Sequence, residues 1–175
     1  YSGGVDSHVL LQLLAKSGHP LLENLVAIHV DHGLNNDSSL WAQHCDNIAT
    51  DLKVDFISLK ANVCNIDSLG MEAAAREARY QALQEALTSD DILLTAQHQE
   101  DQAETLLLQL FRGAGPKGLS AMASHFKLGD TETIRPLLNV SQADIVNYAQ
   151  QQKLQWIDDP SNVETRWNRN YIRHK

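Results

Sequence analysis

The first residues of the chain have the composition of a phosphate-binding loop. Two adjacent glycines lie between hydroxyl side chains, with one carboxylate close by, and an apolar run with helical spacing follows. Adjacent glycines let backbone N–H groups converge, and a helix N-terminus adds donors and partial positive charge. No Lys follows the glycines, so this is not a Walker A motif and it suits a pyrophosphate leaving group. The alternative is an ordinary Gly-rich turn. The predicted nucleotide-binding residues are Ser2, Gly3, Gly4, Val5, Asp6 and Ser7, with Asp6 also the predicted Mg²⁺ ligand.

A second stretch with chemical potential lies at residues 95–105. On a helix, Asp101 and Glu104 share one face, while the opposite face carries Ala103 and the leucines at 106, 107 and 110. We expect the leucine face to be buried and the carboxylates to point to the edge of a sheet, where they could bind Mg²⁺ or an amine substrate. A helix start that is simply favoured by its acids is the alternative. Arg112 lies about 16 Å along the helix from Asp101, so we expect it to contact a polynucleotide or to be structural.

A third group combines arginines with a tyrosine. Arg76, Arg79 and Tyr80 have the i, i+3, i+4 spacing that places them on one helical face. An arginine there could neutralise phosphate charge or hold a base edge. Surface ion pairs with Glu72 and Glu77 are the alternative.

Alternating strands and helices must position these groups. Strand-like runs are expected at 25–30, 54–59, 92–96 and 133–135, and helices at 6–16, 39–52, 71–87, 100–112 and 141–152. This alternation predicts an α/β, Rossmann-like parallel sheet with helices on both faces. In such sheets ligands bind beyond the carboxyl ends of the strands, where the loop, Asp31-His32 and Gln97-His98 all fall. A strand feeding the loop is expected upstream, so the first strand is expected to be truncated.

Composition limits the classes of protein that fit. The 175 residues suggest one domain, and no run reaches transmembrane length, so we expect no membrane partner and a cytoplasmic protein. The net charge of −8 argues against a general nucleic-acid surface, although residues 165–175 are basic and without acids. Cys45 and Cys64 have neither zinc nor C-x-x-C spacing and are expected to be reduced. A homodimer is left open.

Several ordered motifs resemble those of a known family. The loop matches the S-G-G-x-D-S signature of PP-loop ATP pyrophosphatases, a fold of the adenine-nucleotide alpha-hydrolase type. Together the motifs are similar to the catalytic domain of bacterial tRNA(Ile)-lysidine synthetases over nearly the whole chain. The motifs are Ser2–Ser7, His29–Leu34, Glu72–Tyr80, Asp101–Thr105, Arg112-Gly113, Gly118-Leu119, Arg135–Leu138, Asp159–Asn162 and Arg169–Arg173.

The resemblance implies a PP-loop ATP-dependent catalytic domain over residues 1–175, without the family's C-terminal tRNA-binding domains. It implies ATP-dependent joining of free L-lysine to C2 of the wobble cytidine in tRNA(Ile) with a CAU anticodon, with release of AMP and pyrophosphate. The implied catalytic residues are Asp6, Asp31, Arg76, Asp101 and Glu104. The implied substrate-binding residues are His98, Asp101, Glu104, Arg112, Arg169 and Arg173.

Three positions depart from the family pattern. Gln97 replaces the first residue of a His-His pair, Glu100 replaces the first of an Asp-Asp pair, and Asn35 replaces an Arg. Two other functions stay open. A tRNA thiolase on the same loop would need reactive or cluster-binding cysteines, and a non-catalytic nucleotide-binding module would need neither the acidic helix nor the basic end.

Overall fold

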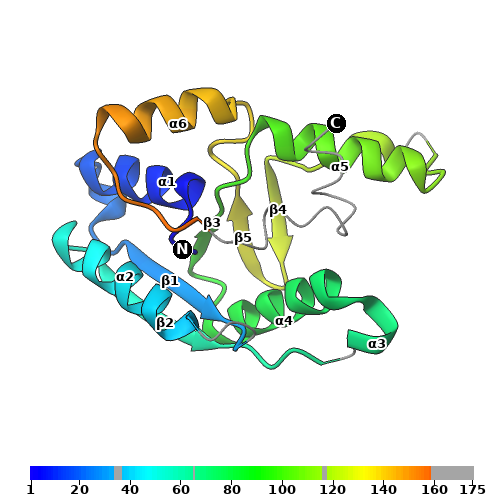
Figure 1. The fold of residues 1–175 in the computed structure, drawn as a ribbon, viewed down its shortest axis with the longest axis horizontal. Coiled ribbons are helices and arrows are strands. Elements are labelled where there is room, and N and C mark those ends of the chain that lie inside the picture. The colour runs from blue at the N-terminus through cyan, green and yellow to red at the C-terminus, as the bar shows by residue number, and fades with distance from the viewer. Residues whose placement is uncertain (34–36, 65, 116–117, 159–175) are drawn as a thin grey trace.

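The computed structural model describes residues 1–33, 37–64, 66–115 and 118–158 (Figure 1). It has the predicted α/β class, with parallel strands and helices. The sequence expectations at Asn35, Arg169 and Arg173 lie outside the described residues. The elements in chain order are α1 (Val5–Lys16), η1 (Pro20–Leu22), β1 (Val26–Asp31), α2 (Ser38–Asp51), β2 (Asp55–Lys60), α3 (Ile66–Leu69), α4 (Met71–Ala86), β3 (Ile92–Leu94), α5 (Gln99–Phe111), η2 (Gly118–Ser120), β4 (His125–Leu128), β5 (Thr131–Ile134) and α6 (Gln142–Gln151).

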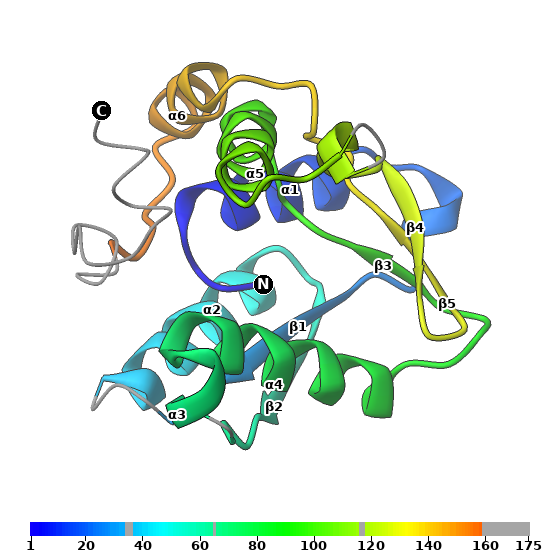
Figure 2. The ribbon, with the colours of Figure 1, turned by 90° about the vertical axis from the view of Figure 1, so that its right-hand side faces the viewer.

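The described strands form two sheets with helices on two sides. β1 pairs with β2 in parallel, and the second sheet has the order β3-β5-β4, in which β3 and β5 are parallel. Helices α1, α5 and α6 gather on one side of the molecule and α2, α3 and α4 on the other (Figures 1 and 2). The chain's first residues lie between the two sheets, where the Tyr1 backbone nitrogen donates a hydrogen bond to the Ile28 carbonyl. The strand expected upstream of the loop would lie outside residues 1–175 and stays a prediction.

The strand expected at residues 133–135 is part of a hairpin that sequence analysis missed. β4 runs antiparallel to β5, with Leu128 opposite Thr131. Gly129 has φ +62° and is the first of the two turn residues, which is the position where a two-residue hairpin turn favours glycine. An antiparallel edge strand on a parallel pair needs only this short turn, whereas another parallel strand would need a long crossover.

Helix α1 is the most deeply buried helix and links two parts of the core. Val9 and Leu10 pack against Leu137 and against Ile145 and Ala149 of α6. On another side of α1, Leu11 packs with Ala27 of β1 and Ala49 of α2. The loop that precedes α1 is therefore attached to a helix held from two directions, which limits how far the loop can move.

Helix α5 corrects the expectation that its leucine face is buried. Leu106, Leu107 and Leu110 are 41%, 38% and 54% exposed, whereas Glu104 is only 4% exposed. The opposite face packs through amide side chains. Gln102 accepts from Met122 N–H and donates to Met122 O at 2.7 and 2.8 Å. These hydrogen bonds satisfy backbone groups of the segment after η2, so the polar face of α5 turns inward.

No helix in the described part of the chain combines the length and apolarity needed to cross a membrane.

Candidate functional site at the Gly-Gly loop and the start of α5

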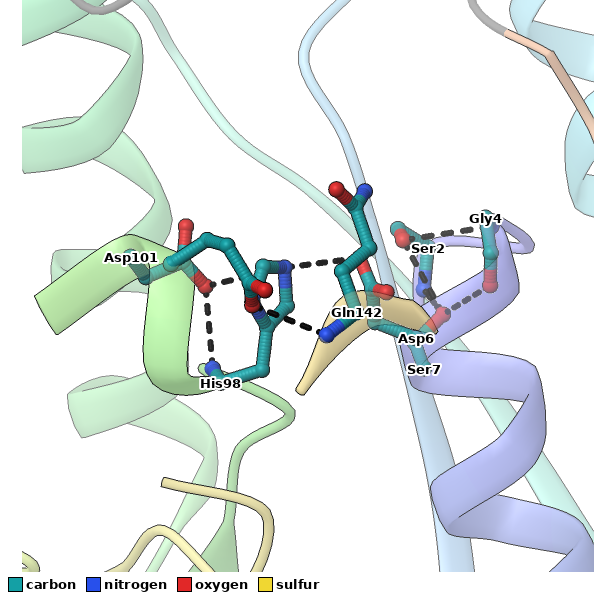
Figure 3. A network of polar contacts seen from close by, with 8 residues as sticks. Ser2, Gly4, Asp6, Ser7, His98, Asp101 and Gln142 are labelled. Carbon is teal, nitrogen blue, oxygen red and sulfur yellow. Dashed lines mark hydrogen bonds and ion pairs between the residues drawn. The ribbon is translucent and has the colours of Figure 1, made fainter. Parts of the chain in front are cut away.

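The Gly-Gly loop is held in shape by hydrogen bonds of its two serine hydroxyls. The Ser2 and Ser7 hydroxyl oxygens lie 3.1 Å apart, and Ser7 donates to the Gly4 carbonyl at 3.0 Å (Figure 3). Ser2 N–H donates to Ser7 Oγ at 3.2 Å. The loop then enters α1, whose first-turn N–H groups have no intrahelical acceptor. The loop therefore presents hydroxyls and backbone donors in a fixed shape, as an anion site requires.

The two positions of the loop require glycine for different structural reasons. Gly3 has φ +83°, and a Cβ there would lie 2.7 Å from Ile157 Cδ1 and 3.0 Å from Cys45 Sγ. Its carbonyl accepts a hydrogen bond from Ile157 N–H at 2.9 Å. Gly4 has φ −70°, and a Cβ there would meet only Ser2 Oγ, at 3.5 Å. Gly3 is thus needed for packing and backbone conformation, while the absence of a side chain at Gly4 leaves room for a ligand.

His98 joins the loop to the acidic helix. This imidazole is 1% exposed, and its Nε2 lies 3.7 Å from Asp6 Oδ2 and 3.6 Å from Asp101 Oδ2 (Figure 3). Asp101 also accepts the His98 backbone N–H at 3.1 Å, the reciprocal half of a capping box at the start of α5. The helix-start role that sequence analysis kept as an alternative for Asp101 is therefore present in the structure, alongside its place next to Asp6.

Glu100 ties this cluster to α6. Its Oε2 lies 3.0 Å from His98 Nδ1 and accepts Gln142 N–H at 2.8 Å. Desolvation opposes ionisation of Glu100, but the hydrogen bonds from Gln142 and His98 outweigh it, so the pKa of the carboxyl is below its usual value. The departure from the family pattern at this position therefore contributes to the helix junction.

Asp31, at the end of β1, precedes a histidine that contacts α4. Its Oδ1 accepts Gly33 N–H at 2.8 Å. The neighbouring His32 places its Nε2 3.3 Å from both Nε and Nη2 of Arg79. Burial, followed by the nearby Arg79 charge, lowers the pKa of His32 to about 4. His32 is therefore neutral at pH 7, and its Nε2 can accept a hydrogen bond from Arg79.

Arg76 lies on an aromatic side chain one turn along the same helix. Its Nη2 donates to Tyr80 OH at 3.3 Å, and its Cζ lies 4.9 Å from the Tyr80 ring centroid. Tyr80 also interacts with Arg135. No carboxylate of the described residues pairs with Arg76, Arg79 or Arg135 within 4.0 Å, so the surface ion pairs considered from sequence are not formed.

The predicted site residues form two groups with one outlier. Asp6, His98 and Asp101 come together around one imidazole, and the buried Glu104 follows Asp101 on α5. Asp31 and Arg76 belong to the group at β1 and α4. Arg112 is exposed at the opposite end of α5 from Asp101.

A Mg²⁺ ion at Asp6 would have to take most of its ligands from elsewhere. Within the described ranges, no group of three or more His, Cys, Asp or Glu side chains is arranged to hold a metal ion. This fits a cation that keeps water and phosphate ligands and takes one or two from protein carboxylates.

Sequence reasoning assigned no role to several residues that connect the site. Glu100 and Gln142 join α5 to α6, and Arg135 reaches Gln97 Oε1 at 3.1 Å. Arg135 had a signal in its place in the Arg-Pro-Leu-Leu motif, and Gln97 and Glu100 had one as departures from the family pattern. The contacts of Glu100 and Gln142 depend on how α6 packs, which no local pattern encodes.

Comparison with known proteins identifies the class that this loop and fold define. The family described as the PP-loop domain matches residues 1–175, and the chain belongs to that family. Among solved structures, the U34-tRNA thiolase NcsA from Methanococcus maripaludis, with its [4Fe-4S] cluster, has the same fold. It shares 19% identity with a TM-score of 0.75, covering 98% of this chain and 61% of the thiolase.

The curated relatives narrow this class. The chain is 46% identical over 177 residues to tRNA(Ile)-lysidine synthase from Coxiella burnetii, covering 100% of the chain and 39% of that protein. It is 47% identical to the enzyme of the same name from Pectobacterium atrosepticum, covering 100% of the chain and 40% of that protein. The chain thus spans about two fifths of the length of these relatives.

Proposed function

We propose that residues 1–175 form the ATP-dependent catalytic domain of an enzyme that makes lysidine in tRNA(Ile) with a CAU anticodon. The substrates are ATP, free L-lysine and the wobble cytidine, and the reaction takes place in the cytoplasm. The observation that carries the proposal is the Asp6–His98–Asp101 cluster, which places a pyrophosphate-type loop beside an acidic helix start. The two chemical half-steps need these two features side by side.

In the first half-step, cytosine O2 attacks the α-phosphorus of ATP, and the bond to the bridging oxygen breaks with loss of pyrophosphate. The loop hydroxyls and the first N–H groups of α1 hold the leaving pyrophosphate. Mg²⁺ held by Asp6 would neutralise phosphate charge when bound. Asp31 and Arg76 lie near the cytosine and the α-phosphate.

In the second half-step, an amine of lysine attacks C2 of the adenylylated cytidine. The C2–O2 bond breaks, AMP departs with O2, and the amine loses a proton. Asp101 and Glu104 receive the lysine ammonium group, for which the buried carboxylate of Glu104 is suited. His98 contacts the substrate beside these carboxylates and also positions Asp6 and Asp101. Arg112, Arg169 and Arg173 contact the tRNA. The reaction needs one site per chain, and a homodimer is a separate prediction.

The test incubates the complete protein that carries residues 1–175 with ATP, Mg²⁺, radiolabelled lysine and unmodified tRNA(Ile) bearing CAU. Label that stays on the tRNA through mild base treatment supports the proposal, because an aminoacyl ester would hydrolyse. Asp101→Asn should abolish labelling and leave ATP affinity within about threefold of wild type. Asp46→Asn, at an exposed position of α2, is the matched control and should label normally.

The thiolase alternative predicts a different outcome in the same assay. It requires no lysine and transfers sulfur to the tRNA when a sulfur donor is supplied. Burial raises the pKa of the Cys45 thiol to about 11, so this group is a poor source of thiolate at neutral pH. Replacing Cys45 and Cys64 together with Ser should therefore leave lysine transfer intact. A non-catalytic binding module would bind ATP without any labelled tRNA.

A further inference from the structure

Arg135 joins the two groups of the candidate site. It follows β5, the central strand of its sheet, and is 7% exposed. On one side its Nε donates to Gln97 Oε1 at 3.1 Å, next to His98. On the other side it interacts with Tyr80, whose hydroxyl accepts from Arg76. The chain of contacts therefore runs from the start of α5 to α4.

The Arg135 guanidinium has a fixed orientation. Its Nη1 donates to the Ala123 carbonyl, and its Cζ lies 4.1 Å from the centroid of the Phe126 ring. Gln97 is fixed in turn, because its Oε1 also accepts Thr95 Oγ1–H at 2.6 Å. A planar guanidinium stacked on a ring and hydrogen-bonded at several nitrogens has a geometry that a lysine ammonium does not reproduce.

The arrangement holds positive charges close together. Arg76 is exposed, whereas Arg135 is buried, and Tyr80 is the contact between them. No carboxylate in the described part of the chain pairs with either arginine. Two uncompensated guanidinium groups repel each other, so their separation must be held by the groups between them. Tyr80 can do this because its hydroxyl accepts from Arg76 and its side chain also interacts with Arg135.

We propose that Arg135 is a positioning residue that acts through Tyr80 to aim the Arg76 guanidinium at an anionic substrate group. The Gln97 contact sets Arg135 relative to the His98 cluster, so the same residue fixes the distance between the two halves of the site. This inference rests on the proposed function only in naming the substrate group as the α-phosphate or the nucleotide being activated. Arg135 does not touch the substrate itself.

The test is a double-mutant cycle on the complete protein, followed by pyrophosphate release. Arg135→Lys and Tyr80→Phe should each lower kcat/KM on the order of tenfold, because Arg76 is misplaced. In an Arg76→Lys background, which keeps a charge and residual turnover, each should lower kcat/KM less than about twofold. Lys127→Gln, at an exposed position of β4, is the control and should have no effect in either background.

The outcomes separate this inference from a structural role and from the proposed function. Equal losses in both backgrounds would overturn the inference, because Arg135 would then act on the fold rather than through Arg76. The inference would also be overturned if Arg135→Lys and Tyr80→Phe left kcat/KM almost unchanged in the wild-type background. Pyrophosphate release without lysine transfer in the unmodified protein would contradict the proposed function and still allow the cycle to be measured.

Discussion

His98 Nε2 and Asp6 Oδ2 lie 3.7 Å apart, although Asp6 belongs to α1 and His98 is the residue that precedes α5. The same nitrogen lies 3.6 Å from Asp101 Oδ2. The loop and the acidic helix are therefore held as one unit by a single buried side chain. Because His98 reaches Glu100 through its other ring nitrogen, its two sides have separable tasks.

Substitutions at His98 should separate these two tasks. Asparagine places a polar atom near the Nδ1 position and keeps the Glu100 contact, whereas glutamine reaches toward the Nε2 position and Asp6. We expect His98→Asn to lower turnover strongly and stability by about 1 kcal/mol, since the Nε2 contacts with Asp6 and Asp101 are lost. His98→Gln should retain more turnover. Pyrophosphate release and urea unfolding measure the two effects, and equal turnover losses in both variants would contradict separable roles.

The two loop glycines should respond differently to alanine. Gly3→Ala places a methyl group 2.7 Å from Ile157 Cδ1 at φ +83°, and we expect a loss of about 2 kcal/mol or more. Gly4→Ala should change the free energy of unfolding by less than about 0.5 kcal/mol. It should nevertheless weaken ATP binding, because its methyl group occupies the space a phosphate would approach. Thermal unfolding and ATP titration give the comparison. Strong ATP binding by Gly4→Ala would argue against this loop as the nucleotide site.

Local sequence patterns predicted the order of strands and helices, the loop and the acidic helix start. They did not predict β4, because His125–Leu128 offers only two apolar residues, Phe126 and Leu128, between charged and polar ones. Periodicity separated the two faces of α5 but could not say which face packs inward. The Arg135–Gln97 contact joins residues 38 positions apart and depends on how β5 lies beside β3.

His32 should make the folded state sensitive to moderately acidic pH. The unfolded imidazole binds a proton below its ordinary pKa of 6.5, whereas burial and Arg79 keep the folded one neutral until its pKa of about 4. Protons therefore favour the unfolded state, and stability falls as pH drops from 6.5 to about 4, by on the order of 2 kcal/mol. His32→Asn should flatten this dependence in urea unfolding across that range. His19→Asn, at an exposed position, is the control, and an unchanged slope in His32→Asn would contradict the prediction.

The exposure of the α5 leucines can be tested by comparing the truncation of one of them with the truncation of a buried leucine of α1. Leu10→Ala removes a side chain that is 6% exposed in the α1–α6 core, and we expect a loss of about 2–5 kcal/mol. Leu110→Ala, at 54% exposure, should stay within about 0.5 kcal/mol of wild type. Urea unfolding of both variants tests the inward-facing polar side of α5. A large loss for Leu110→Ala would show that its face is covered in solution.

The contact between Gly3 and Ile157 also has a consequence for the newly made chain. Ile157, which is made long after Gly3, donates a hydrogen bond to the Gly3 carbonyl. Its side chain occupies the space where a Cβ of residue 3 would lie. At a synthesis rate of ~5–20 residues per second, Ile157 is added roughly 10–30 s after the loop. The Gly-Gly loop thus completes its packing only after Ile157 has been made, and a chain that stops before Ile157 should lack a finished nucleotide loop.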